Sequence, residues 1–130
     1  MDEVNKFQPD GQLIGVWYIR RGATFRKHYA WKTGPKEGPH TPVDLTGWTA
    51  RGLVRDKADP ATILIDLTEV GKASITLEGA TGGILIEIEA ETATLIASKK
   101  GLFDIELVNG TFVKNFAGGE VIFLGEQTHA

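Results

Sequence analysis

From residue 16 onward the sequence alternates between short runs rich in β-branched and aromatic residues and clusters of Gly, Pro, Asp and Asn. The runs recur roughly every ten residues, and no long helical pattern lies between them. This arrangement is typical of an antiparallel β-sandwich or barrel and disfavours a parallel α/β fold. An all-β fold is therefore expected. The candidate strands are residues 16–20, 24–31, 48–54, 63–67, 73–77, 84–90, 102–108, 111–116 and 121–124.

Two of these runs show which face of the strand is buried. In residues 24–31, Phe25, Tyr29 and Trp31 fall two or four positions apart, which places all three aromatic rings on one side of a strand. In residues 84–90, Glu87 and Glu89 alternate with isoleucines, so the two carboxylates share the side opposite the apolar residues. Each strand is expected to bury one face.

The segments between the runs predict the connections. Asn109-Gly110 joins two alternating runs and suits a two-residue type I′ turn, so a hairpin is expected there. Residues 33–42 hold three prolines and two glycines and are expected to form a loop. Residues 91–97 are the one candidate for a short helical turn, which would lean on the sheet. Residues 1–15 lack periodicity and are expected to form an extended arm before a domain spanning 16–130.

The length and composition suit one domain with a hydrophobic core. The chain has 130 residues, of which 42% are hydrophobic and 24% charged. It contains no cysteine, so disulfides, thiolate metal sites and a cysteine nucleophile are excluded together. It also lacks a long apolar run or a signal-peptide pattern, so no membrane partner and assembly in a cytoplasm are expected.

Charge is distributed unevenly along the chain, whose net charge is −3. Residues 1–60 carry ten Lys and Arg against seven Asp and Glu, whereas residues 61–130 carry four against ten. Such an asymmetry could let the basic part of one copy meet the acidic part of another, since complementary charge steers association. A mixed, solvated surface is the alternative interpretation.

No group of residues has the spacing that catalysis or metal binding requires. His28, His40 and His129 are scattered, so no metal or other cofactor is expected. The pairs Glu87/Glu89 and Asp104/Glu106 are better explained as polar sides of strands than as acid–base pairs. The glycines at 79, 82 and 83 are not followed by the Lys and Ser or Thr of a phosphate loop. An enzymatic role is not expected.

One cluster combines basic and aromatic side chains, near the start of the expected domain. It could be a protein contact, a nucleic-acid surface or ordinary surface; alternation points most of its rings inward and the chain is acidic, so nucleic acid is not expected as a partner. The cluster comprises Arg20, Arg21, Arg26, Lys27 and Lys32 with Trp17, Tyr18, Phe25 and Trp31. The residues expected at an interface are Trp17, Tyr18, Arg20, Arg21, Pro35, Pro39 and His40.

Residues 42–48 are expected to form a structural corner. Pro42 fixes φ, Asp44 and Thr46 can accept hydrogen bonds from nearby backbone N–H groups, and Gly47 permits a sharp change of direction that delivers Trp48 into the core. With the two residues that follow, the stretch reads Pro-Val-Asp-Leu-Thr-Gly-Trp-Thr-Ala, and a strand ending in Val-Arg-Asp-Lys comes after it.

This pattern resembles the small immunoglobulin-like domains of tailed-phage baseplate and tail-fibre-attachment proteins. Four further stretches are similar to that family, and the resemblance covers about residues 20–128. It implies an antiparallel immunoglobulin-like β-sandwich and a structural role in the virion, where repeated copies or a homo-oligomer contact other virion proteins. A carbohydrate-binding or host-recognition module is the alternative, with Trp17, Trp31 and Trp48 as the available platforms. The further stretches are 22–25, 65–68, 102–107 and 118–121.

Overall fold

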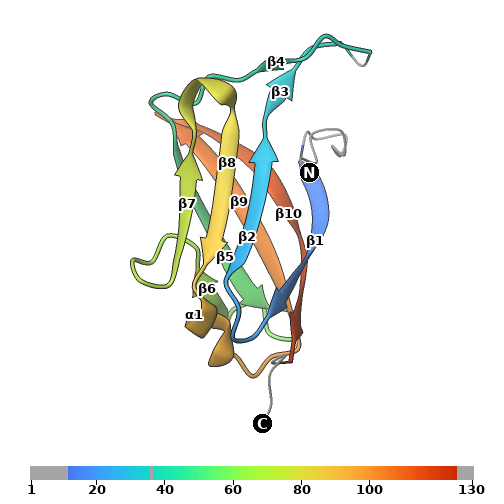
Figure 1. Ribbon diagram of the computed structural model, residues 1–130, viewed down its shortest axis with the longest axis vertical. Helices are drawn as coiled ribbons and strands as arrows, with labels where there is room; N and C mark the ends of the chain where they lie inside the picture. Colours follow the sequence, from blue (N-terminus) through green and yellow to red (C-terminus); the bar gives the residue numbers. More distant parts are fainter. Residues whose placement is uncertain (1–11, 36, 126–130) are drawn as a thin grey trace.

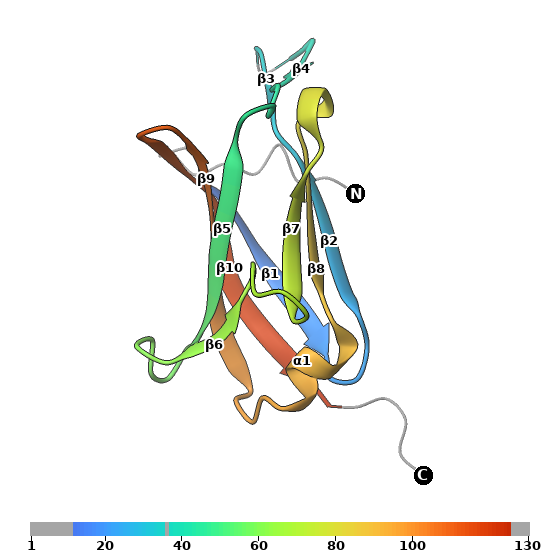
Figure 2. The same cartoon turned by 90° about the vertical axis from the view of Figure 1, so that its left-hand side faces the viewer.

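The computed structural model describes residues 12–35 and 37–125 and shows an all-β protein, as expected. Two sheets face each other and enclose the core (Figures 1 and 2). The larger sheet has the order β1-β10-β9-β5-β6 and the smaller one the order β2-β8-β7. The larger sheet consists of β1 (Leu13–Arg20), β5 (Thr49–Asp56), β6 (Ile63–Asp66), β9 (Lys100–Asn109) and β10 (Phe112–Leu124). The smaller sheet consists of β2 (Phe25–Ala30), β7 (Ala73–Leu77) and β8 (Gly83–Ile88).

Aromatic side chains from both sheets form the centre of the core. Trp17 on β1 stacks on Phe103 of β9 with ring centroids 3.8 Å apart, and it also contacts Phe25 across the gap on β2. The Trp17 indole Nε1 donates a buried hydrogen bond of 2.9 Å to the hydroxyl of Tyr29. Tyr29 meets Phe116 of β10 edge to face. The aromatic face predicted for residues 24–31 therefore points into the core.

Strands β1 and β10, the first and the last in the chain, pair in parallel, whereas a fully antiparallel fold was expected. Leu13 lies opposite Ala117 and Arg20 opposite Leu124. A parallel pair needs a long connection, and here the rest of the domain supplies it. Strand β1 begins at Leu13, so the end of the segment expected as an arm belongs to the sheet. The rest of that segment, residues 1–11, lies outside the described residues.

Strand β10 is a single strand of 13 residues, not the two strands expected at 111–116 and 121–124. A bulge at Phe116 inserts one extra residue and turns its ring into the core. The residues between those two expected strands include Gly118 and Gly119, a pair typical of a turn, but both lie within β10. A Cβ on Gly119 would sit 1.8 Å from the carbonyl oxygen of Gly15, so glycine there allows β1 to approach β10 closely.

The hairpin expected at Asn109-Gly110 is present between β9 and β10, but its turn is of a different type. Asn109 pairs with Phe112 in the ladder, so the two loop residues are Gly110 and Thr111. Gly110 has a φ of +63° and no described residue other than glycine has a positive φ. A positive φ at the first loop residue alone fits a type II′ turn, whereas type I′ needs it at both.

Short elements occupy the two ends of the molecule. At one end the proline-rich loop projects beyond the sheets, and its ends pair as β3 (Lys32–Thr33) and β4 (Thr41–Pro42), which the sequence did not predict (Figure 1). At the same end, the 3-10 turn Gly79–Thr81 precedes β8. At the opposite end lies helix α1 (Ala90–Thr94), which begins one residue before the helical turn expected at 91–97 and ends three residues earlier.

Candidate interaction surface

The described histidines occupy separate places in the fold. The Nε2 atom of His28, on β2, lies 2.8 Å from a carboxylate oxygen of Glu78. His40 lies in the exposed proline-rich loop, and His129 is outside the described residues. Within residues 12–35 and 37–125, no three His, Asp or Glu side chains are grouped closely enough to hold a metal ion.

The carboxylate pairs singled out in the sequence lie on the outer faces of the sheets and are divided among different partners. Glu87 accepts a 2.7 Å ion-paired hydrogen bond from Arg26 on the neighbouring strand. Glu106 accepts a 2.6 Å bond from Arg51 in the same way. Ion pairs of this exposed kind contribute at most about 1 kcal/mol each. Their geometry is that of cross-strand pairs on a sheet surface.

Asp104 differs from the other carboxylates on the large sheet. Partial burial raises the pKa of its carboxyl, and the negative charge of Glu106 adds to that effect, while Arg55 and a backbone hydrogen bond from Leu53 oppose it. The group lines a shallow hollow of about 340 Å³ together with Arg51 and Asp66. Glu106 and Arg55 line the same hollow, so acidic and basic side chains lie next to each other on the outer face of the sheet.

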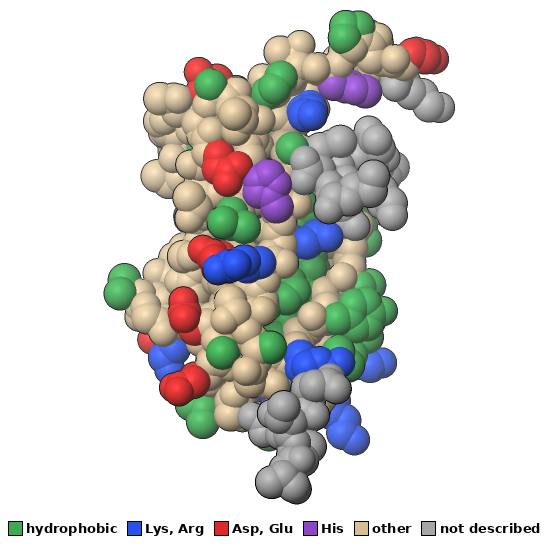
Figure 3. Space-filling model, in the orientation of Figure 1, with side chains coloured by type: hydrophobic (Ala, Val, Ile, Leu, Met, Phe, Trp, Pro, Cys, Tyr) green, Lys and Arg blue, Asp and Glu red, His purple; other side chains and the backbone are tan. Residues whose placement is uncertain are grey.

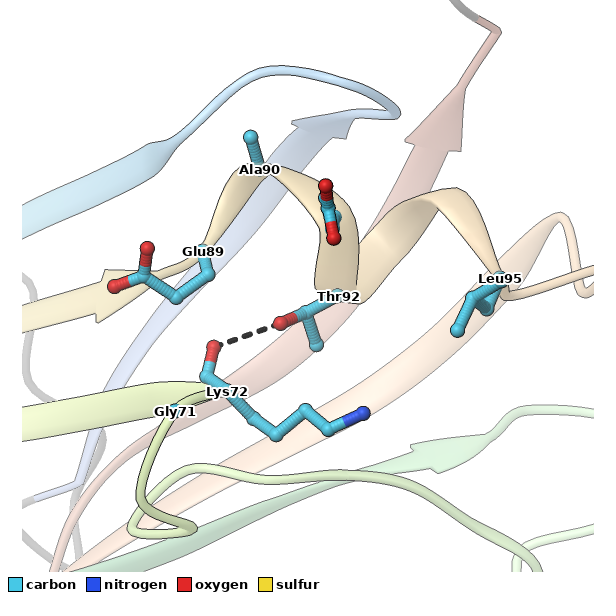
Figure 4. A pocket seen from close by; sticks show the side chains of 7 residues that line it. Gly71, Lys72, Glu89, Ala90, Thr92 and Leu95 are labelled. Atoms are coloured by element: carbon cyan, nitrogen blue, oxygen red, sulfur yellow. Dashed lines mark hydrogen bonds between the residues drawn. The ribbon is translucent and has the colours of Figure 1, made fainter.

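A second hollow, of about 440 Å³, lies beside α1 (Figure 4). The Thr92 hydroxyl donates a 2.8 Å hydrogen bond to the backbone oxygen of Lys72, and this bond joins two sides of the hollow. In Figure 4 the ammonium of Lys72 and the carboxylate of Glu89 point in opposite directions.

The residues expected at an interface have different locations. Trp17 is 1% exposed and belongs to the core, so its assignment to an interface or a sugar platform was wrong. Its neighbour Tyr18 is 60% exposed. Arg20 is half-buried and its guanidinium donates to the backbone oxygen of Gly125. Alternation along β1 explains this outcome, because consecutive residues point to opposite faces.

Arg21 is used within the fold. Its guanidinium donates to the backbone oxygens of Ile96, Ser98 and Leu124 at 2.9, 2.7 and 3.3 Å. The same group lies 5.8 Å from the centre of the Phe123 ring. Arg21 thus joins the end of β1 to the segment after α1 and to the end of β10, a role that the sequence did not reveal.

Three of the expected interface residues lie in the projecting loop, where Pro35, Pro39 and His40 are all exposed. The peptide bond before Pro39 is cis. The described part of the loop pairs with neither the larger nor the smaller sheet, because β3 and β4 pair only with each other. Its position at the tip of the molecule leaves it accessible to another protein (Figure 1).

The corner at residues 42–48 forms as expected in its backbone. The Asp44 carboxylate accepts hydrogen bonds from the backbone N–H and the hydroxyl of Thr46, and these bonds lower the pKa of Asp44. Gly47 has a φ of +85°, and Pro42 lies in β4. The side chain that the corner buries is Leu45, at 2% exposed, whereas Trp48 is half-buried against the rim of the core.

An exposed apolar area on the outer face of the large sheet was not expected from the sequence. Ile14 and Val16 on β1 are 40% and 47% exposed, and Leu102 on β9 is 37% exposed. Together with Tyr18 they point away from the core. In Figure 3 hydrophobic side chains gather along the side where β1 runs. The alternation of residues 13–19 indicates a strand with an exposed apolar face, but this strand was not recognised because residues 1–15 were interpreted as an arm.

Comparison with known proteins gives no family. No family model matches the chain, and no curated protein matches it. Within the described residues, no helix is both long and apolar enough to span a membrane.

Proposed function

We propose that the chain is a structural protein that works through contacts with other proteins, as a tail or baseplate component of a tailed-phage virion. The observation that carries the proposal is the exposed apolar area around Val16 and Tyr18 on an edge of the large sheet. Large apolar side chains that gather on one surface mark a site of interaction with another protein. The exposed loop containing Pro35 and Pro39 provides a second place for contact.

We further propose that the fold is an immunoglobulin-like β-sandwich. The order β2-β8-β7 corresponds to strands B, E and D of that fold, and the run β10-β9-β5 corresponds to G, F and C. In this assignment β1 lies beside G and β6 beyond C. The chain has no cysteine pair between the sheets, and Trp17 on the first strand fills the centre of the core instead.

The corner supports the phage assignment through its resemblance to baseplate domains. The spacing of Pro42, Asp44, Thr46 and Gly47 is that of the family pattern, and the Asp44–Thr46 hydrogen bonds give the pattern a structural reason. The residues hold a turn, which supports a structural role.

Analysis of purified virions tests this proposal. Mass spectrometry of particles purified through a density gradient should detect the chain in a fixed ratio to the other tail proteins. Immunogold labelling should then place it on the tail or baseplate. A chain that stays in the soluble fraction and is missing from the particles would overturn the virion assignment.

A carbohydrate-binding module remains the second candidate because Phe112 is 57% exposed with its ring against Trp48. Exposed aromatic rings can stack on sugar rings, and Trp48 is half-buried where Trp17 is fully buried. Binding on a glycan array that is lost in Phe112→Ala, while the circular dichroism spectrum is kept, would favour this function. Absence of binding across the array would count against it.

A further inference from the structure

The strand register defines how side chains lie beside one another on the outer face of the large sheet. Three rows cross the strands. The middle row runs from Val16 through Glu120 and Leu102 to Arg55. The row on one side runs from Tyr18 through Ile122 to Lys100, and the row on the other side runs from Ile14 through Gly118 and Asp104 to Leu53.

In all three rows the part formed by β1 and β10 is mostly apolar. Val16 and Tyr18 are among its most exposed members, and Ile122 lies half-buried beside Tyr18. The one charged side chain among these residues of β1 and β10 is Glu120. Its carboxylate accepts a hydrogen bond from Lys57, and this bond holds the pKa of Glu120 below its usual value. The apolar area therefore contains a carboxylate that already has its counter-ion.

Charges of opposite sign lie on the two sides of the middle row. Toward the end of β1 the face is basic, and toward the start of β1 it is acidic. The basic side carries Arg20, Lys57 and Lys100, the middle row carries Arg55 and Glu120, and the acidic side carries Arg51 with Asp66, Asp104 and Glu106.

We propose that the outer face of the large sheet is covered by a second copy of this chain, related by a two-fold axis that crosses the strands along the middle row. This operation reverses the strand direction, so the basic side of each copy lies over the acidic side of the other. Lys100 then faces Asp104 of the partner subunit. A two-fold contact must be self-complementary, and the charges on the two sides of the axis satisfy that condition, while Glu120 and Arg55 on the axis face the same residues of the partner subunit.

The size of the face fits such a contact. Five strands about 4.8 Å apart and about eight residues long cover a flat area of roughly 600 Å². Side chains that stand above the sheet increase the accessible area, which approaches the roughly 800 Å² per partner of a standard specific interface. The apolar area lies at one side of this footprint, and a charged surface adjoins it.

The inference rests on the proposed structural role for its biological meaning, but its test uses the purified chain alone and is independent of virions. Sedimentation velocity at about 0.1 mM should show a dimer, because a micromolar Kd would leave few monomers at that concentration. Tyr18→Ser should weaken the dimer at least about tenfold. Val70→Ser is the matched control, because Val70 is 96% exposed on another part of the molecule, and it should leave the dimer unchanged.

Charge reversal tests the orientation of the two copies. Lys100→Glu and Asp104→Lys should each weaken the dimer about tenfold, and the double variant should recover most of the loss because the opposite charges meet again. Circular dichroism checks that each variant is folded; if Asp104→Lys is not, Asp104→Asn with Lys100→Gln replaces the pair and should weaken the dimer without recovery. A monomeric wild type, or a dimer unaffected by Tyr18→Ser, would overturn the second-copy proposal. If Lys100→Glu and Asp104→Lys each weaken the dimer and their folded double variant does not recover, the proposed orientation is overturned; with the neutral pair, an unchanged dimer would overturn it.

Discussion

At the scale of single residues, adjacent positions on one strand serve opposite purposes, as Trp17 and Tyr18 show. Trp17→Phe removes the hydrogen bond from Nε1 to the Tyr29 hydroxyl and part of the stack on Phe103. We expect the free energy of unfolding to fall by about 2 kcal/mol in urea denaturation. Tyr18→Phe on the same strand is the control and should change it by less than about 0.5 kcal/mol. Equal losses in the two variants would contradict the burial of Trp17.

Asp104 provides a prediction that depends on pH. Folding raises the pKa of this carboxyl, so ionisation costs stability above the folded pKa and costs nothing below the unfolded pKa, near 4. Asp104→Asn removes that cost and keeps an oxygen that can accept from Leu53. In dilute solution the variant should therefore have a higher Tm than wild type at about pH 7, and the gain should disappear near about pH 3.

The control for this prediction is Glu69→Gln, an exposed carboxyl in the loop before β7. This substitution should leave the difference between the Tm at about pH 7 and the Tm at about pH 3 the same as in wild type. A lower Tm for Asp104→Asn at neutral pH would show that the ionised carboxylate stabilises the fold through Arg55, contrary to the balance of burial and charge described above.

At the scale of elements, the close approach of β1 to β10 depends on Gly119. In Gly119→Ala the new Cβ would lie 1.8 Å from the backbone oxygen of Gly15, and backbone atoms cannot yield as a flexible side chain would. We expect β1 to separate partly from β10, with a loss of about 3 kcal/mol or more and faster hydrogen exchange at the β1 amides. Gly125→Ala, where a Cβ meets nothing within 4 Å, should behave as wild type.

Local pattern predicted most of the strands and the faces that two of them bury, but the only pairing it predicted was the hairpin between β9 and β10. The alternation around Tyr29 correctly gave a buried aromatic face, because side-chain period is a local property of a strand. The turn at Gly110 was placed one residue too early, since Asn-Gly suits two turn types that differ by that shift. Gly118 and Gly119 were taken as a turn, because a glycine needed for close approach looks the same in sequence as a turn glycine.

At the scale of the whole molecule, the candidate surface could be predicted less well than the fold, because strands distant in sequence form it together. Tyr18, which was expected at an interface, is exposed, but its neighbours Ile122 and Leu102 come from strands about 80 to 100 residues away in sequence. Only the register of β1, β10 and β9 brings them into one area. Trp17 and Arg21 were assigned to the surface because a basic and aromatic cluster in the sequence does not show which members the core uses.

The pairing of the first strand with the last predicts how the molecule unfolds. Trp17 on β1 contacts Phe25 on β2 and Phe103 on β9, so one side chain joins both sheets. Because β1 also completes the sheet beside β10, loss of either terminal strand should open the core that both layers share. We expect one cooperative transition in urea, and the midpoints from tryptophan fluorescence and far-UV circular dichroism should coincide. Separate midpoints would show that the two sheets unfold independently, which a core shared through Trp17 does not allow.

Refolding should take milliseconds to seconds, because contacts between residues so distant in sequence form slowly.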